Sequence, residues 1–217
     1  MTSEGRLTGE GRVRVAAIIP VGTFDGAKTR LAGSLDAEER QDLVEGLLAR
    51  TVVAALAVDG LDDVLVISPD REVLTHASEL GARTMLQRTD GLNAGLEEAR
   101  ADVIAGGAAA LIVLPIDLPF VTADAVAAIV AALTSDSDPT VVLVTDRHGS
   151  GTNILGLSPP DVIVFAFGSG SRIAHRTAAD ASGASYVELD SALSVDLDTP
   201  DDFVFVESMT PEQPRGG

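Results

Sequence analysis

The sequence predicts an α/β fold in which helices cover both faces of a largely parallel sheet, giving three layers. Short aliphatic runs alternate with segments of helical periodicity along most of the 217 residues. Hydrophobic residues make up 46% of the chain and aromatic residues only 3%, which fits a core of Val, Ile, Leu and Ala. We expect one domain over residues 13–208, because no linker or internal repeat interrupts the pattern.

The expected strands are apolar runs, and each lies near an expected helix. The strands are residues 13–20, 63–68, 82–87, 109–115, 140–145 and 185–189. The helices are residues 36–58, 71–80, 92–105, 123–133 and 172–182. Asp36 and Thr122 are expected to cap two of these helices, because their side-chain oxygens accept from helix amides that lack partners.

Two kinds of segment fall outside this alternation. The Gly/Ser-rich stretches 147–160 and 165–171 contain no expected strand. Residues 1–12 and 209–217 are expected to be disordered tails.

Composition excludes several classes of site and partner. The chain has no cysteine, so any metal must take oxygen or imidazole ligands. A net charge of −18 argues against general binding to nucleic acid or to anionic membranes. No apolar run approaches the roughly 20 residues of a membrane span, and the N-terminal segment is too polar for a signal peptide. We therefore expect a soluble, cytoplasmic protein.

Polar motifs follow the expected strands closely. They are "TFDGAKTR", "SPD", "DLP" and "DRHGSGTN", after the first, second, fourth and fifth strands. Ligands of such sheets bind beyond the carboxyl ends of the strands. We expect the motifs to gather at one edge of the sheet and to form the binding site there.

The loop after the first strand is similar to a phosphate-binding P-loop only in part. A P-loop has a glycine directly before its lysine, whereas Ala27 separates Gly26 from Lys28. Lys28 is the only lysine among the 15 basic residues. Gly26 lets the backbone approach a nucleotide, and Lys28 and Arg30 bring positive charge to its phosphates. The alternative is a solvated turn with two surface cations.

Three aspartates are candidate ligands for Mg²⁺. Asp117 follows an almost wholly apolar strand, and Mg²⁺ prefers one or two carboxylates together with substrate phosphates. Asp196 and Asp198 face the same side of an extended segment, so either could complete a site with Asp117. The alternatives are ordinary turn and capping roles beside prolines.

Two glycine-rich loops offer amides and hydroxyls to a carboxylate or phosphate. Thr152 lies in "DRHGSGTN", and Ser171 ends "FGSGS", which precedes a helix whose N-terminus adds positive potential. The alternative is a pair of hinges without ligand. Nearby cationic or titratable side chains are Arg147, His148, Arg172 and His175.

Gly91 and Asn93 stand at a helix start. Asn93 either caps that helix or hydrogen-bonds a base or ribose, and residue type alone favours the cap.

No protein nucleophile stands out anywhere in the chain. Metal-assisted phosphoryl or nucleotidyl transfer needs positioning and charge neutralisation instead, and the residues fit that class best.

Eight motifs come in a fixed order over nearly the whole chain: "IPV", "FDGAKTRL", "VISPD", "GLN", "LPIDLP", "DRHGSGTN", "FAFGSGS" and "VDLDTPDD". Together they closely resemble the phosphoenolpyruvate / 2-phospho-L-lactate guanylyltransferases that build the deazaflavin coenzyme factor 420. The resemblance implies a Rossmann-like nucleotidyltransferase fold of the GT-A-like kind, in agreement with the α/β pattern.

The resemblance also implies a reaction. GTP condenses with phosphoenolpyruvate to give enolpyruvyl-diphospho-guanosine and pyrophosphate. The alternatives are the same reaction on 2-phospho-L-lactate or 3-phosphoglycerate and, more distantly, a non-catalytic nucleotide-binding module. A homodimer is compatible with so small an enzyme.

Roles follow residue by residue from the resemblance. Lys28 and Arg30 would bind GTP phosphates, and Gly91 and Asn93 would lie by the guanosine. The Mg²⁺ ligands would be Asp117 with Asp196 or Asp198, and the three-carbon acid would be held by Thr152, Gly168 and Ser171. The family usually has a lysine after "IPV" where this chain has Gly22. Either Arg147 or Arg172 is expected to compensate, or activity is weaker.

Overall fold

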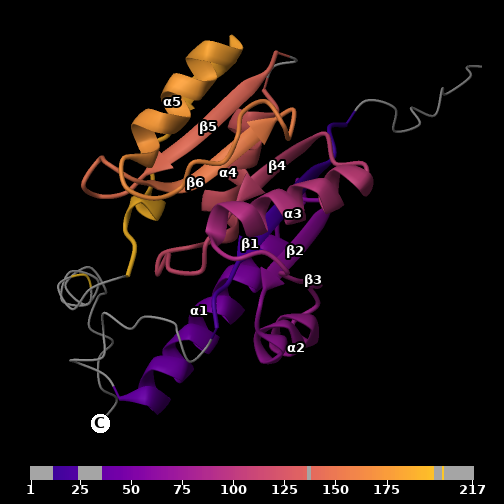
Figure 1. Ribbon diagram of the computed structural model, residues 1–217, viewed down its shortest axis with the longest axis vertical. Coiled ribbons are helices and arrows are strands. Elements are labelled where there is room, and N and C mark those ends of the chain that lie inside the picture. Colours follow the sequence, from indigo (N-terminus) through magenta and orange to yellow (C-terminus); the bar gives the residue numbers. More distant parts are fainter. Residues whose placement is uncertain (1–11, 24–35, 136–137, 198–201, 203–217) are drawn as a thin grey trace, which may run out of the picture.

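The computed structural model describes residues 12–23, 36–135, 138–197 and 202 (Figure 1). Within them, seven strands form one sheet in the order β3-β2-β1-β4-β6-β5-β7. The strands are β1 (Val15–Pro20), β2 (Asp63–Ser68), β3 (Arg83–Leu86), β4 (Ala110–Val113), β5 (Thr140–Thr145), β6 (Thr152–Ser158) and β7 (Ser185–Glu188). Among these strands β6 alone runs antiparallel to its neighbours, β4 and β5. The prediction of a mostly parallel sheet is confirmed.

Helices cover both faces of this sheet. They are α1 (Ala37–Leu56), α2 (Arg71–Glu79), α3 (Leu92–Ala105), α4 (Ala123–Leu133) and α5 (Ser171–Ser182), and a short 3-10 helix η2 (Ala192–Ser194) follows. One core cluster joins α1, α2 and α4 to one face of the sheet. A second joins α3 and α5 to the other face, the near side in Figure 1. The three-layer arrangement is therefore confirmed.

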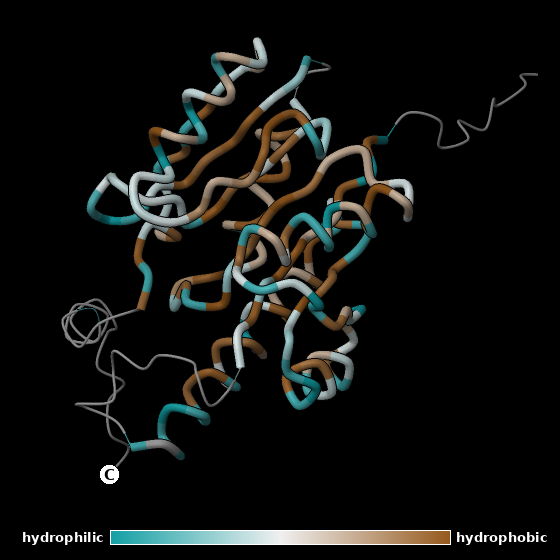
Figure 2. The backbone as a smooth tube through the Cα atoms, viewed as in Figure 1, coloured by the Kyte–Doolittle hydropathy of each residue, from teal (hydrophilic) through white to brown (hydrophobic). Residues whose placement is uncertain are grey.

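Alternation along β1 shows how the sequence supplies both cores. Ile18 belongs to the cluster under α3 and Ile19 to the cluster under α1, and both are fully buried. Because both faces are covered, the strands read as continuous apolar runs, which Figure 2 shows as brown segments through the centre of the molecule. None of the helices that the structure describes combines the length and apolar character needed to cross a membrane.

Two predicted helix caps are confirmed. The Asp36 carboxylate accepts from the Glu39 amide at 2.9 Å, and the Glu39 side chain accepts from the Asp36 amide at 2.9 Å. This reciprocal pair satisfies two amides at the start of α1. The Thr122 hydroxyl accepts from the Ala125 amide at 3.2 Å and starts α4.

Strand β6 is the one strand of this sheet that the sequence pattern did not predict. It begins in a Gly/Ser-rich stretch and is interrupted by Gly156, so its apolar run looks short. The glycine has a packing reason: a Cβ there would lie 3.4 Å from both the Leu133 and Val142 side chains. The strand inserts between β4 and β5 and runs antiparallel to them. Its first residue, Thr152, therefore lies at the edge where the parallel strands end.

Candidate functional site

Two of the three aspartates predicted to bind metal come from segments that are hydrogen-bonded to each other. Asp117 follows β4, and its carbonyl oxygen accepts from the Leu197 amide at 2.9 Å. Leu118 and Leu197 are buried and anchor the two segments. The structure thus brings Asp117 and Asp196 to the same edge of the sheet, and Asp198 lies outside the described residues.

The donor set there suits a hard cation. Carboxylate oxygens are what Mg²⁺ prefers, and the chain has no thiolate that would favour a softer metal. No cluster of three or more His, Asp or Glu side chains occurs among the described residues. Asp117 and Asp196 would therefore need further oxygen ligands from nucleotide phosphates or water.

The start of the predicted nucleotide loop is fastened to β2. The Val21 amide donates to the Ile67 carbonyl at 2.9 Å, and the Ser68 hydroxyl donates to the Gly22 carbonyl at 3.2 Å. A Cβ added at Gly22 would meet nothing within 4 Å, so the backbone there has room for a side chain. Gly26, Lys28 and Arg30 lie outside the described residues, and their roles stay predictions.

The start of α3 differs from the favoured prediction. Gly91 is the N-cap, at φ +88°, and α3 has no side-chain cap. Asn93 is instead clamped to Phe167, 74 residues away, by donating to its carbonyl at 3.0 Å and accepting from its amide at 2.9 Å. The capping role for Asn93 is therefore wrong. Its contact with a nucleotide, like that of Gly91, stays a prediction.

The segment Gly168–Gly170 offers the open hydrogen-bond donors on this side of the molecule. Gly168 and Gly170 have φ of +129° and +72°, which glycine adopts without strain. The amides of Gly168, Ser169 and Gly170 meet no acceptor among the described residues. Consecutive free amides of this kind form an anion-binding concavity. Ser171 follows directly, and within the described chain its hydroxyl has no partner.

The N-terminus of α5 is occupied by the protein itself. The Ser171 amide donates to the Gly168 carbonyl at 3.1 Å, and the Arg172 amide to the Ser150 carbonyl at 3.4 Å. The next two amides of the helix both donate to the Gly170 carbonyl. An anion here would therefore bind to the preceding glycine loop rather than to the first turn of the helix.

Thr152 is joined to this loop through a histidine that sequence reasoning did not assign. The Thr152 hydroxyl lies 3.0 Å from His175 Nδ1, and His175 Nε2 accepts from the Ala166 amide at 3.0 Å. The Phe167 ring packs edge-on against the imidazole at 5.1 Å. His175 is fully buried, and burial lowers its pKa to about 4. The one sequence signal was its spacing on the buried face of α5, four residues after Ser171 and four before Ala179.

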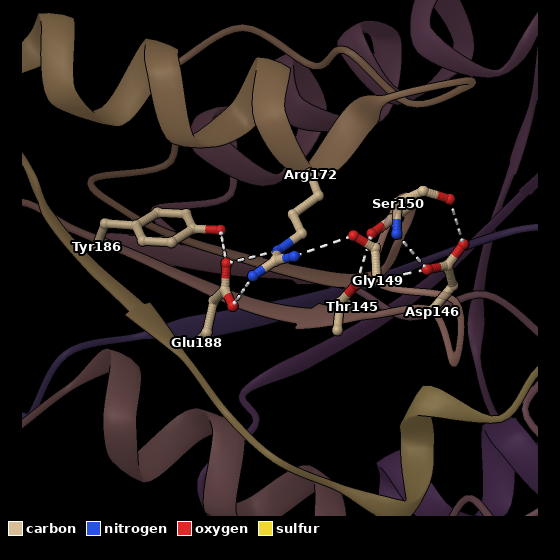
Figure 3. A network of polar contacts seen from close by, with 8 residues as sticks. Thr145, Asp146, Gly149, Ser150, Arg172, Tyr186 and Glu188 are labelled. Atoms are coloured by element: carbon tan, nitrogen blue, oxygen red, sulfur yellow. Dashed lines mark hydrogen bonds and ion pairs between the residues drawn. The ribbon is translucent and has the colours of Figure 1, made fainter.

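The turn between β5 and β6 is filled by the protein's own carboxylate, as Figure 3 shows. Asp146 accepts from the Ser150 amide at 2.7 Å and from the Ser150 hydroxyl at 3.2 Å. Burial alone would raise the pKa of Asp146, but hydrogen bonds from the Gly151 and Ser150 amides hold it below its usual value. The donors of Ser150 in this turn are therefore already used by Asp146 and are not open to a bound anion.

The two arginines expected to compensate for Gly22 lie in ion pairs. Arg172 bonds Glu188 at 2.8 Å and the Gly149 carbonyl at 3.0 Å (Figure 3). Arg147 bonds the buried Asp202 at 2.5 Å. Hydrogen bonds from Arg172 lower the pKa of Glu188, so the pair stays charged near neutral pH. Compensation by either arginine is therefore not supported.

Comparisons with known proteins give relatives that match over most of the chain. The family described as "Guanylyl transferase CofC like" matches residues 15–209. A phosphoenolpyruvate guanylyltransferase of Sphaerobacter thermophilus is 42% identical over 187 residues, covering 86% of this chain and 89% of that protein. Another, from Rubrobacter xylanophilus, is 41% identical over 195 residues, covering 89% and 94%. A 2-phospho-L-lactate guanylyltransferase of Methanocaldococcus jannaschii is 32% identical over 192 residues, covering 88% and 81%.

Solved structures show the same fold. A protein of Desulfovibrio desulfuricans G20, provisionally named a nucleotide-diphospho-sugar transferase, matches with a TM-score of 0.75 at 14% identity, covering 93% of this chain and 90% of that one. A 4-diphosphocytidyl-2C-methyl-D-erythritol synthase of Anaerococcus prevotii matches with a TM-score of 0.62 at 11% identity, covering 91% and 96%. These likenesses confirm the Rossmann-like nucleotidyltransferase fold. The names of the sequence relatives agree on guanylyl transfer and differ in the acceptor.

Proposed function

The chain belongs to the family of CofC-like guanylyl transferases, and we propose that it condenses GTP with phosphoenolpyruvate in deazaflavin coenzyme biosynthesis. The products would be enolpyruvyl-diphospho-guanosine and pyrophosphate. The observation that carries the choice of acceptor is the 42% and 41% identity to relatives named phosphoenolpyruvate guanylyltransferases. The relative named for 2-phospho-L-lactate, at 32% identity, keeps that acid as the second candidate.

The acceptor would be held by donors alone. The Gly168 amide and the hydroxyls of Thr152 and Ser171 lack acceptors in the described part of the chain, apart from the contact of Thr152 with His175. A carboxylate or phosphate oxygen can only accept, so it complements such a set. Phosphoenolpyruvate carries both kinds of oxygen. The same donors would suit 2-phospho-L-lactate, which is why the geometry alone supports the class of acid.

The reaction needs charge neutralisation rather than a protein nucleophile. An oxygen of the acceptor phosphate would attack the α-phosphorus of GTP in line, and the bond to pyrophosphate would break. The attacking phosphate is already ionised near neutral pH, with a second pKa of about 6, so no general base is required. Lys28 and Arg30 would stabilise the charge that passes to pyrophosphate, and the compact ammonium of Lys28 suits a position between phosphates.

Asp117 and Asp196 would hold the metal in this scheme. Bound by these carboxylates, Mg²⁺ would supply Lewis-acid neutralisation of the phosphate charge. The Asp117 carbonyl accepts a hydrogen bond from the Leu197 amide. This bond fixes the backbone of Asp117 relative to that of Asp196, the residue before Leu197. Asp198, two residues after Asp196, is the alternative second ligand.

The identity of the products tests this proposal. We would incubate the protein with GTP, MgCl₂ and phosphoenolpyruvate and follow phosphorus by NMR. The expected result is free pyrophosphate together with a new unsymmetrical diphosphate. Formation of GDP would identify a phosphotransferase instead. The reaction is repeated with 2-phospho-L-lactate and with 3-phosphoglycerate. Binding of GTP with no new phosphorus signal in any of the three reactions would favour a non-catalytic module.

A further inference from the structure

The His175 imidazole links two parts of the acceptor site. Its Nδ1 faces the Thr152 hydroxyl at 3.0 Å, and its Nε2 faces the Ala166 amide at 3.0 Å. Thr152 begins β6, and Ala166 lies two residues before Gly168. The ring is fully buried, and its hydrogen-bond and ring partners, Thr152, Ala166 and Phe167, are all uncharged.

Hydrogen-bond accounting fixes the tautomer of this ring. A backbone amide can only donate, so Nε2 must accept from Ala166 through its lone pair. A neutral imidazole with an unprotonated Nε2 carries its proton on Nδ1. Burial of the ring among uncharged groups favours that neutral form, because a charged imidazolium would lose its hydration. His175 therefore donates from Nδ1 to the Thr152 hydroxyl oxygen.

The hydrogen bond from His175 determines that the Thr152 hydroxyl acts as a donor toward any other partner. A hydroxyl has one proton to donate, and its oxygen here already accepts from the imidazole. No acceptor for the Thr152 hydroxyl proton occurs among the described residues. That proton is therefore available to solvent or to a ligand, and a ligand atom that it meets must be an acceptor such as a carboxylate or phosphate oxygen.

We propose that His175 is a positioning residue for the acceptor acid, which it serves by holding Thr152 as an outward hydrogen-bond donor. The inference rests on the proposed function, since it concerns the acceptor of that reaction. The bond from Ala166 has two effects: it fixes the tautomer, and it ties the segment leading to Gly168 to the same ring. His175 itself lies behind Thr152 and does not touch the acceptor.

Two substitutions test the hydrogen bonds of Nδ1 and Nε2 separately. An asparagine places its amide as many bonds from Cα as Nδ1, so His175→Asn keeps a donor for Thr152 and loses the acceptor for Ala166. A glutamine reaches as far as Nε2, so His175→Gln keeps an acceptor for Ala166 and loses the donor for Thr152. Each serves as the control for the other, because both replace a buried ring with an amide.

The test is a double-mutant cycle on the Michaelis constants for phosphoenolpyruvate and GTP, measured by pyrophosphate release. We expect His175→Gln to raise the KM for phosphoenolpyruvate about fivefold, the usual worth of one hydrogen bond, with the KM for GTP unchanged. His175→Asn should raise it less. Thr152→Val should raise it at least as much as His175→Gln, and the double variant should be no worse than Thr152→Val alone.

Several results would overturn the inference while the proposed function stands. These are an equal rise in the KM for GTP, a multiplicative effect in the double variant, or an Asn variant as impaired as the Gln variant. A wild-type protein that releases no pyrophosphate would instead refute the proposed function. Nitrogen NMR of the wild-type imidazole then decides the hydrogen-bond assignment, and it also serves if the His175 variants fail to fold. An Nδ1–H tautomer supports the inference, and an Nε2–H tautomer overturns it.

Discussion

The nucleotide side and the acceptor side of the candidate site are built by different interactions. On the nucleotide side, backbone bonds at strand ends hold the segments, as between Leu197 and Asp117 or between Val21 and Ile67. On the acceptor side, buried or half-buried side chains hold the backbone across long stretches of sequence, as Asn93 holds Phe167 and His175 holds Ala166. Asn93 and His175 therefore contribute to the fold as well as to the site, because their side chains hold these segments.

The largest effect is expected from Asp117→Asn, which removes a metal ligand from the nucleotide side. Loss of one group that neutralises transition-state charge typically costs about 10²- to 10³-fold in turnover. The melting temperature should be measured alongside turnover, so that a loss of stability is distinguished from the loss of a metal ligand. Asp124→Asn, at an exposed position in the first turn of α4, is the control. Wild-type dependence on Mg²⁺ in the Asp117 variant would remove this residue from the site.

A smaller loss of activity, accompanied by loss of stability, is expected from Asn93→Ala, because Asn93 holds the acceptor-side segment at Phe167 in addition to its predicted contact with the guanosine. The substitution removes both bonds to Phe167, and two half-buried hydrogen bonds together contribute about 2 kcal/mol to stability. Chemical unfolding and the KM for phosphoenolpyruvate should therefore change together. Leu92→Ala, at the exposed neighbouring position, is the matched control. A variant as stable as wild type, with a raised KM for GTP alone, would contradict this structural role and leave only the predicted contact of Asn93 with the nucleotide.

Gly22→Lys on the nucleotide side is expected to lower the KM for GTP. The position has room for a side chain, and a lysine there would restore the cation that this family usually carries. One added charge-assisted contact with a phosphate should lower the KM for GTP about fivefold or more. Gly22→Gln supplies similar length without charge and should leave the KM for GTP near wild type. Equal effects of the two substitutions would show that charge at this position is not what matters.

The smallest effect concerns the pH dependence of stability on the acceptor side. Burial lowers the pKa of His175 from 6.5 to about 4, so between these values the unfolded chain binds a proton that the folded chain does not. Stability from this group is therefore present above pH 6.5 and falls as the pH drops toward 4. His175→Gln should flatten the fall in melting temperature over that window by a few degrees, roughly as expected for about 1 kcal/mol in a domain of this size. Parallel curves for the two proteins would show that His175 titrates normally.

Most of the fold could be predicted because it depends on local patterns. The run before Pro20 and the run around Val66 are apolar throughout, as strands covered on both faces must be. Strand β6 could not be predicted in this way, because Gly156 interrupts its apolar run. A glycine stands there because side chains of α4 and β5 pack closely against the strand at this point. Those contacts exist only in the folded sheet.

The candidate site was predictable to a different degree on each side. Asp117 could be singled out because a lone carboxylate follows an apolar strand, and the structure does bring it beside the segment of Asp196. Thr152 and Ser171 were singled out by residue type and by family resemblance. The clamp of Asn93 on Phe167 and the buried role of His175 could not be foreseen, because the partners lie 74 and up to 23 residues away and meet only through tertiary packing.

We propose above all that the chain transfers a guanylyl group from GTP to a three-carbon phosphorylated acid. The most direct measurement is pyrophosphate release with GTP and Mg²⁺ in three parallel reactions, containing phosphoenolpyruvate, 2-phospho-L-lactate or 3-phosphoglycerate. We expect rapid release of pyrophosphate with phosphoenolpyruvate and little with the other two acids. Saturable binding of GTP without pyrophosphate release from any of the three mixtures would contradict this proposal.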